Sequence, residues 1–375
     1  MGNIRRKPSG RYEARYRDAA NRLRGRTFAT KSEARRFLER VGADIQRGEW
    51  RDPRLGRILF RDWALHVESI RLNRRPSTRT RDATLVRTRI LPTFGDCQLA
   101  AITTVDVKVW VASLEADGLA PTTIRKCYQL LANAMSEAED AGLIVRTPCR
   151  KVRLPTDERD APVLLTPRDV QRLAEVVPSR YRGLVLTAAY TGLRWGELCG
   201  LRVPRVDLLR RRIDVIDVLI EVDGELSFGP PKTRRSRARV SFPPFLADVL
   251  GAHIGAFPDP DPSRQLVFTS DDSAPLRRSN FRRRVWVPAV EEAGLPLETT
   301  FHALRHACAS WLIEAGANPL EVAEKLRHTK ITTTLSVYGH LFPGTDDRLD
   351  TALQEAHNLG ESTATPARIP RARPA

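Results

Sequence analysis

The stretch FHALRHACASWLIEAGANPLEVAEKLRHTKITTTLSVYGHLF, residues 301–342, predicts a series of short helices that carry reactive side chains. Its first polar residues, His302, Arg305 and His306, are spaced i, i+3 and i+4, so on a helix they share one face. The other face is apolar and is predicted to be buried through Leu304, Cys308, Trp311 and Leu312. The first helix therefore presents two imidazoles and a guanidinium on one side.

Two more short helices are expected in the same stretch. Asn318 and Pro319 have the residue types preferred at the N-cap and at the first position of a helix. Thr332 can cap a third helix that carries Tyr338, and His328 lies between the second and the third. Because these groups could converge in space, the stretch is a candidate active site.

The charge of the chain indicates what this site acts on. The chain has 375 residues, enough for two or three domains, and its 62 Lys and Arg exceed its 45 Asp and Glu by 17. Residues 1–57 alone contain 17 Lys or Arg and 7 Asp or Glu, a difference of +10. A GC-rich genome would favour arginine over lysine but would not explain so large a surplus. The balance favours a polyanionic partner, with nucleic acid as the first candidate.

The cysteines and the apolar runs indicate the compartment. The five cysteines are scattered and contain no C-x-x-C, which argues against a disulfide framework or a zinc ribbon and for a reducing compartment. No apolar run reaches the roughly 18 residues of a membrane helix, and no signal peptide opens the chain. We expect a soluble cytoplasmic protein without a membrane partner.

The basic N-terminal segment predicts a small folded module. Residues 11–17 alternate as a strand does, and residues 22–28 resemble a second short strand. Thr30 or Ser32 then caps a helix that runs through Ile45. Apolar side chains give the module a core: Tyr12, Tyr16, Phe28, Phe37 and Leu38. A small basic sheet backed by a helix can enter a DNA groove, so we favour a DNA-binding module over the alternative, a solvated basic tail.

Residues 58–153 predict a four-helix unit. Its apolar stripes are Phe60, Trp63, Ala64 and Val67 on one helix and Val105, Val109, Trp110 and Leu114 on a later one. Arg79, Arg125 and Lys126 are candidate contacts to DNA phosphates rather than base readers. The alternative is a structural bundle with a charged solvent face.

A linker and a larger domain complete the chain. Residues 154–164 are polar without apolar periodicity, which predicts an interdomain linker. The last domain spans 165–359 and ends in an amphipathic helix at 345–359, followed by a disordered tail at 360–375.

Strands are expected in the middle of the last domain. Residues 213–220 predict a strand, Asp223 and Gly224 its hairpin turn, and residues 239–242 a returning strand. Lys232 would lie between strands on a mobile hairpin.

Metal-independent chemistry on a phosphodiester needs a nucleophile, cations for the non-bridging oxygens and an acid for the leaving hydroxyl. Arginine suits the second role because its planar fork bonds two oxygens and stays charged. A tyrosine nucleophile gives a phosphotyrosyl link that preserves the bond energy, so rejoining needs no ATP. No carboxylate-rich metal cluster stands out. The residues available for these roles are Arg194, Lys232, His302, Arg305, His328 and Tyr338.

Five motifs in order carry these residues: TGLRWGEL at 191–198, PKT at 231–233, HALRH at 302–306, LRH at 326–328 and YGH at 338–340. Each alone would occur by chance, but the ordered set resembles the signature of the tyrosine recombinases of the phage integrase family. The resemblance covers nearly the whole chain. It implies a mainly α fold with small β elements (α+β).

In that family the N-terminal module, here 1–57, is an arm-binding domain with a three-stranded sheet and a helix. The resemblance assigns 58–153 to a helical, SAM-like core-binding domain. It assigns 165–359 to a mostly α catalytic domain with a small antiparallel sheet.

The resemblance also implies roles. Arg194 and Arg305 would clamp the scissile phosphate, and His302 would assist proton transfer and position the phosphate. Lys232 would be the general acid toward the leaving 5′ hydroxyl. Tyr338 would be the nucleophile that forms a 3′-phosphotyrosyl link.

His328 would donate to a phosphate oxygen, and Glu197 and His306 would support the site. The sequence departs from the family at Arg327, where the motif usually has glycine before the second histidine.

The implied function is that of a site-specific integrase of a phage or other mobile element, without metal or cofactor, in the bacterial cytoplasm and nucleoid. Its partners would be double-stranded DNA and three further copies in a tetramer on paired sites, and the resemblance allows a DNA-bending protein or a directionality factor. The alternatives are a chromosome-dimer resolving recombinase, which usually lacks the basic N-terminal module, a non-catalytic DNA-binding protein with this fold, and a metal-dependent nuclease.

Overall fold

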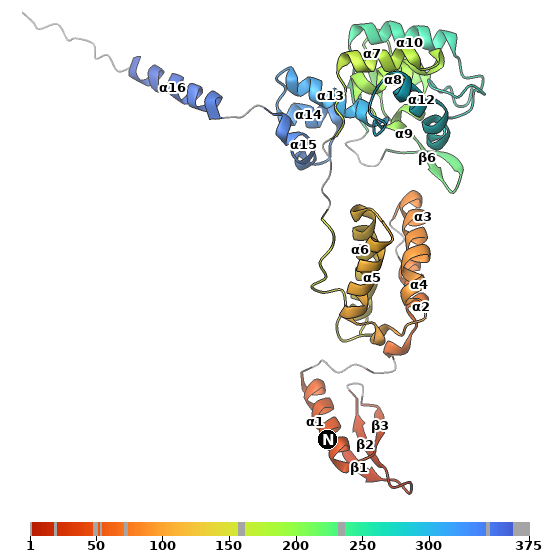
Figure 1. The fold of residues 1–375 in the computed structure, drawn as a ribbon, viewed down its shortest axis with the longest axis vertical. Coiled ribbons are helices and arrows are strands. Elements are labelled where there is room, and N and C mark those ends of the chain that lie inside the picture. The colour runs from red at the N-terminus through yellow and green to blue at the C-terminus, as the bar shows by residue number, and fades with distance from the viewer. Residues whose placement is uncertain are drawn as a thin grey trace, which may run out of the picture. The chain divides into compact units, whose positions relative to one another are not determined.

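A computed structural model describes residues 2–18, 21–47, 52, 55–70, 74–156, 162–231, 237–342 and 346–362. The chain divides into two compact units, residues 1–159 and 160–375. Helices predominate, and the strands form small antiparallel sheets, so the expected mainly α fold with small β elements is confirmed (Figure 1). No helix among the described residues is both long and apolar enough to cross a bilayer.

The basic N-terminal segment forms an antiparallel sheet covered by a helix. In chain order its elements are β1 Asn3–Arg6, β2 Tyr12–Arg17, β3 Leu23–Phe28 and α1 Lys31–Gln46. The strands lie in the order β1-β2-β3, and α1 packs on all three. Thr30, rather than Ser32, caps α1: its hydroxyl accepts from the Glu33 N–H, and the Glu33 carboxylate accepts from the Thr30 N–H. The expected three-stranded sheet with one helix is confirmed.

The rest of the first unit is helical. Its helices are α2 Phe60–Ile70, α3 Pro76–Leu85, α4 Leu91–Phe94, α5 Thr104–Ala116 and α6 Pro121–Asp140, with a π-turn at Val86–Ile90 that joins α3 to α4. The stripe expected on α5 was wrong in part, because Val105 and Val109 are 66% and 63% exposed. Val107 and Val111 have the same spacing and are buried, since only they share a face with Trp110.

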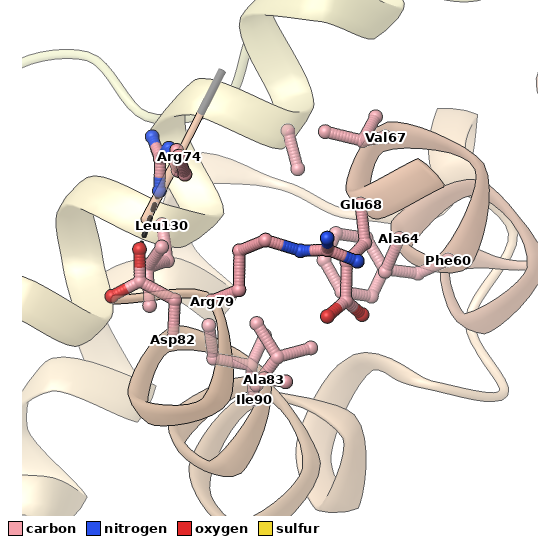
Figure 2. A pocket seen from close by; sticks show the side chains of 12 residues that line it. Phe60, Ala64, Val67, Glu68, Arg74, Arg79, Asp82, Ala83, Ile90 and Leu130 are labelled. Atoms are coloured by element: carbon pink, nitrogen blue, oxygen red, sulfur yellow. Dashed lines mark hydrogen bonds and ion pairs between the residues drawn. The ribbon is translucent and has the colours of Figure 1, made fainter. Parts of the chain in front are cut away.

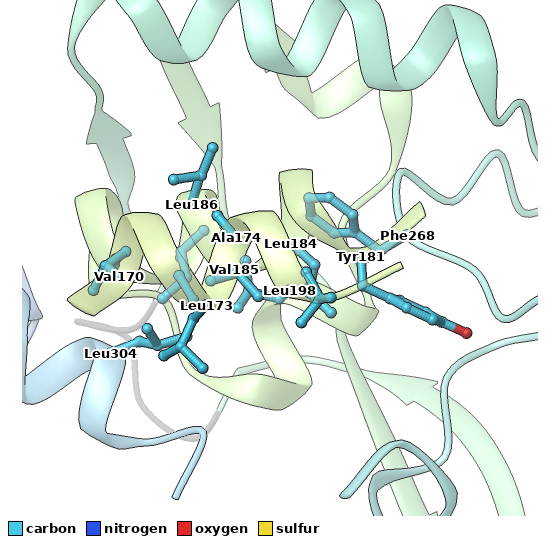
Figure 3. Packing of buried hydrophobic residues seen from close by; sticks show 14 of the residues in the cluster. Val170, Leu173, Ala174, Tyr181, Leu184, Val185, Leu186, Leu198, Phe268 and Leu304 are labelled. Carbon is cyan, nitrogen blue, oxygen red and sulfur yellow. The ribbon is translucent and has the colours of Figure 1, made fainter. Parts of the chain in front are cut away.

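The second unit is organised around one buried helix. Its helices and strands before residue 301 are α7 Pro167–Val176, α8 Ser179–Thr191, α9 Trp195–Cys199, β4 Val206–Asp207, β5 Arg212–Asp214, β6 Val218–Val222, β7 Glu225–Gly229, β8 Arg239–Ser241, α10 Pro244–Ala256, α11 Arg278–Phe281 and α12 Val287–Glu292. Helix α8 is buried on almost every side. Its Leu184 and Val185 pack with Leu173 of α7, Leu198 of α9 and Leu304 from the C-terminal part of the unit (Figure 3).

The strand expected at 213–220 is divided between two sheets. Strand β5 lies between β4 and β8, whereas β6 pairs with β7 in a separate hairpin. Asp223 and Gly224 have φ angles of 52° and 81° and form the expected tight turn. An alternating pattern does not distinguish one long strand from two short ones that leave for different sheets.

Three short helices form a second, smaller core. They are α13 Ala303–Glu314, α14 Pro319–Leu326 and α15 Ile331–Tyr338, and they enclose Cys308, Ala309, Ile313, Val322, Leu326 and Tyr338. The Asn318 side chain caps α14 as expected, accepting from two N–H groups of the first turn. Helix α15 begins at Ile331, so Thr332 lies inside it and is not its cap. The expected last helix is present as α16, Asp346–Ser362, and it extends three residues into the segment 360–375 that was expected to be a disordered tail (Figure 1).

Gly192, at the end of α8, allows the two cores to meet. Its φ is +63°, and a Cβ at this position would lie 2.6 Å from Cδ2 of Leu326 and 3.4 Å from Sγ of Cys308. A side chain here would therefore separate α8 from α13 and α14.

We predict that Gly192→Ala lowers the free energy of unfolding by about 2–5 kcal/mol, about 1–2 from the left-handed backbone and about 1–3 from overpacking. The matched control is Gly294→Ala, because Gly294 has φ +65° and open space around its Cα. It should lose only the backbone part. Urea unfolding of both variants measures the difference, and equal losses would contradict the steric argument.

Candidate active site

Arg194 is the N-cap residue of α9 and is held by a carboxylate of the same helix. Its backbone N–H donates to Oε2 of Glu197 at 2.9 Å, and its Nη1 donates to Oε1 at 3.1 Å. Glu197 is 4% exposed, whereas the Arg194 side chain is 39% exposed. The carboxylate is thus an interior anchor for a guanidinium that still reaches the surface.

Arg305 lies in the first turn of α13 and is buried. Its Nη1 and Nη2 donate to the carbonyl oxygens of Gly192 and Leu326, which end α8 and α14. Carbonyls at helix ends lack intrahelical partners and carry the negative end of the dipole, so they suit a cation. Burial, with the nearby charges of Arg194 and Arg327, lowers the pKa of Arg305 to about 9, so it is still largely charged at pH 7.

Tyr338 ends α15 with its side chain buried at 2% exposure. Its hydroxyl oxygen lies 2.8 Å from Nδ1 of His306. Burial raises the pKa of Tyr338 to about 12, and burial together with the charge of Arg305 lowers the pKa of His306. At neutral pH the tyrosine is therefore protonated and the imidazole is neutral.

The other two histidines are also neutral in the free protein. His328 is buried, and its Nδ1 lies 2.8 Å from the hydroxyl of Thr334. Burial and the charges of Arg305 and Arg194 lower its pKa to about 4. His302 keeps exposed surface, yet partial desolvation of its ring, the cost of protonating it beside His306 and the charge of Arg305 lower its pKa to about 4 as well.

A pocket opens where Arg194, His302 and Arg305 meet. Two further cations line it, Arg278 of α11 and Arg282 of the following π-turn. Neither was predicted from the sequence as a site residue, although the arginine-rich run at 277–284 was a visible signal. Aromatic rings form part of the wall and pack on one another: Trp195, Phe281, Trp286 and Phe301. No group of three or more metal-ligating side chains occurs in the part of the chain that the structure describes.

Arg327 occupies the position at which the sequence departs from the family motif. It has φ 56° and ψ 44°, the left-handed conformation that ends α14. Its guanidinium is 3% exposed, and Nη2 donates to Oε2 of Glu197 at 2.6 Å. The turn before His328 therefore forms with arginine in place of glycine.

Lys232, the expected general acid, lies outside the described residues. Strand β7 ends at Gly229 and β8 begins at Arg239. Its role therefore stays a prediction.

The three candidate DNA contacts of the first unit have different surroundings. Arg79 is exposed on α3 and lines a small pocket, where it extends toward Glu68 (Figure 2). Arg125 is exposed, and its Nε donates to the carbonyl of Pro155 at 3.0 Å. Lys126 is partly buried, with its Nζ 3.2 Å from a carboxylate oxygen of Asp82. Arg79 and Arg125 remain candidates for phosphates, whereas Lys126 would first have to leave its ion pair.

Comparison with known proteins gives matches along the chain. The phage integrase family matches residues 164–344. The phage integrase N-terminal domain matches residues 1–47, and the phage integrase N-terminal SAM-like domain matches residues 63–114.

Individual relatives agree with these matches. The integrase of Mycobacterium phage L5 is 28% identical over 341 residues, 88% of this chain and 90% of that protein. The integrase of Mycobacterium phage FRAT1 is 30% identical over 252 residues, 66% of this chain and 74% of that protein. The structure of the Tn1549 transposon integrase in complex with transposon right-end DNA has the same fold, with a TM-score of 0.70 at 21% identity over 80% of this chain and 99% of that one. The chain belongs to the phage integrase family of tyrosine recombinases.

Proposed function

We propose that this integrase cuts and rejoins double-stranded DNA with Arg194, Arg305 and Tyr338 as its central catalytic residues. The observation that carries the proposal is their convergence from three separate segments. Arg194 and Arg305 line the same pocket. The hydroxyl of Tyr338 makes a hydrogen bond with His306, the residue that follows Arg305 on α13. The Tn1549 integrase, with the same fold, is seen in complex with DNA.

In the proposed reaction the Tyr338 oxygen attacks the scissile phosphorus, and the hydroxyl proton passes to the neutral imidazole of His302, to which the family resemblance gives proton transfer. A bond forms from phosphorus to the tyrosine oxygen, the bond to the 5′ oxygen breaks, and a 3′-phosphotyrosyl link remains. Arg194 and Arg305 stabilise the charge on the non-bridging oxygens, and Lys232 gives a proton to the leaving 5′ hydroxyl. The reverse attack by a 5′ hydroxyl reseals the strand without ATP.

His302 and His328 complete the phosphate site in this proposal. Each is neutral in the free protein, so each can donate one ring N–H to a phosphate oxygen. A phosphate would bring negative charge beside them and raise both pKa values again, which favours proton transfer during the reaction.

We assign His306 to positioning the nucleophile rather than to removing its proton. The pKa of Tyr338 is raised and that of His306 is lowered, so proton transfer between them is unfavourable in the free protein. The hydrogen bond instead keeps the hydroxyl in one orientation.

The catalytic assignment predicts a covalent protein–DNA adduct on a suicide substrate in the presence of EDTA. Tyr338→Phe should abolish the adduct without weakening DNA binding, because the ring still fills the buried site. Gel electrophoresis under denaturing conditions measures the adduct. A non-catalytic DNA-binding protein would give no adduct, and a metal-dependent nuclease would give cut DNA only when metal is added, so either result would overturn the assignment.

The His306 assignment predicts that His306→Ala slows adduct formation at saturating DNA by roughly 10-fold, the value of one buried hydrogen bond. His306→Asn should recover part of the rate, because its amide lies near the position of Nδ1. His306→Gln, whose amide lies near Nε2, is the matched control and should not. The assignment fails if Asn and Gln behave alike.

The rest of the chain is proposed to bind and assemble on the recombination sites of a phage or other mobile element in the bacterial cytoplasm and nucleoid. Residues 1–57 would bind arm-type DNA, residues 58–153 core DNA, and residues 165–359 would carry out catalysis. By analogy with the family, four copies would act together, with a DNA-bending protein or a directionality factor as possible partners, and α16 would pack against a neighbouring copy. Leu353 and Leu359 of α16 are 68% and 70% exposed, which leaves apolar surface for such a contact.

Replacing both Leu353 and Leu359 by Ser should therefore reduce higher-order assembly on paired DNA sites while single-site binding is retained. Leu209→Ser is the control, because Leu209 is 96% exposed and lies outside α16. Sedimentation of the protein–DNA complexes measures the effect. Unchanged assembly of the double variant would remove α16 from the proposed interface.

A further inference from the structure

We propose that Arg327 is a positioning residue that holds Glu197 and, through it, sets Arg194 for the scissile phosphate. The proposal rests on the catalytic role given above to Arg194. Glycine is usual at this position of the family motif, so the motif assigns no role to the Arg327 side chain.

The carboxylate of Glu197 lies between two guanidiniums. Its Oε2 accepts from Nη2 of Arg327 at 2.6 Å and from the Arg194 N–H at 2.9 Å, and its Oε1 accepts from Nη1 of Arg194 at 3.1 Å. Arg327 and Glu197 are 3% and 4% exposed, and the Arg194 side chain is 39% exposed. Arg327, which is buried, therefore orients the Glu197 carboxylate, and this carboxylate orients the more exposed Arg194.

The local turn does not need an arginine. Arg327 has φ 56°, a conformation that glycine adopts without strain and a residue with a side chain adopts at a cost. Burial of a guanidinium costs further free energy unless the charge is paired. The pairing with Glu197 is what offsets both costs, so the side chain acts on the site and not on the turn.

Positive charge exceeds negative charge around this carboxylate. Among the described residues, the ion pairs of Arg194 and Arg327 both end on Glu197, and Arg305 is held by carbonyl oxygens. Nε and Nη1 of Arg327 are buried and have no hydrogen-bond partner in the described part of the chain. Three guanidiniums thus share a single carboxylate among the described residues, and a DNA phosphate is the further anion that the proposed reaction brings to Arg194 and Arg305.

Because Arg194 shares the Glu197 carboxylate with Arg327, the carboxylate holds Arg194 less tightly than it would alone. While Arg327 neutralises part of the charge of Glu197, Arg194 is held in place but keeps guanidinium donors for the phosphate. Without Arg327, the full charge of Glu197 would act on Arg194 and draw it away from the phosphate. The loss should appear in the rate of cutting and not in DNA affinity, most of which arises from contacts elsewhere.

The test measures single-turnover adduct formation by the full chain on a suicide DNA substrate, with DNA affinity and thermal unfolding measured in parallel. Arg327→Met should slow cutting by about 10- to 100-fold, the range expected for a charged hydrogen bond that supports a transition-state contact. Arg327→Lys should recover part of the rate, because it keeps the charge but loses the planar fork. DNA affinity should stay within about threefold, as expected for a group that does not contact the DNA backbone directly.

Arg327→Gly separates the turn from the side chain. It restores the residue that suits the left-handed backbone, so it should fold at least as readily as Arg327→Met and still cut slowly. A rate equal to that of the unaltered chain would overturn the proposal. So would losses of cutting, DNA affinity and thermal stability that run in parallel in all three variants.

A double variant tests the route through Glu197. Because the defect of Arg327→Met arises from an uncompensated carboxylate, Arg327→Met combined with Glu197→Gln should cut no more slowly than the slower single variant. Additive losses would show that Arg327 acts independently of Glu197 and would overturn the proposal. If the unaltered chain forms the adduct and Tyr338→Phe does not, the proposed function stands whatever the Arg327 variants show.

Discussion

The carboxylate of Glu197 lies between the guanidinium groups of Arg194 and Arg327, and a third guanidinium, that of Arg305, is held by carbonyls at the ends of two helices. Three like charges repel one another, and burial makes the repulsion stronger because little water screens it. The site is stable only where each cation has a fixed negative partner. The end of α8, the start of α9, the first turn of α13 and the end of α14 must therefore meet at one place, and Gly192 leaves the space for them to do so.

The positive charge of these guanidiniums and the burial of the site also determine which neighbouring groups are protonated. Burial, together with the charges of the neighbouring arginines, lowers the pKa values of His302 and His328, and burial raises the pKa of Tyr338. Each shift keeps its group in the uncharged form at neutral pH in the free protein. In the proposed reaction, a phosphate between the arginines would bring negative charge beside both histidines and raise their pKa values. The free protein thus holds uncharged hydrogen-bond donors beside fixed guanidiniums, an arrangement that the proposed phosphodiester chemistry would use.

Local features of the fold were predictable where a few neighbouring residues decide them. The Thr30 and Asn318 caps and the turn at Asp223 and Gly224 depend on side-chain and backbone preferences within four residues. The errors arose where a pattern had two solutions. The valines of α5 form two stripes of equal spacing, and the alternating run at 213–220 continues through two strands of different sheets. Thr332 was expected to cap α15, but the helix begins one residue earlier, at Ile331. Packing against distant segments decides such cases.

The sequence by itself determined which chemical groups this protein has and their order, because the five motifs are contiguous and can be recognised without coordinates. That was sufficient for the family and the reaction class. The tertiary structure alone decided the partner of each group. His306 meets Tyr338 across 32 positions, Arg305 meets Gly192 across 113, and Arg327 meets Glu197 across 130. Such pairs depend on how helices pack, and no local spacing encodes them. Arg327 therefore looked like a simple departure from a motif until its guanidinium was seen beside Glu197.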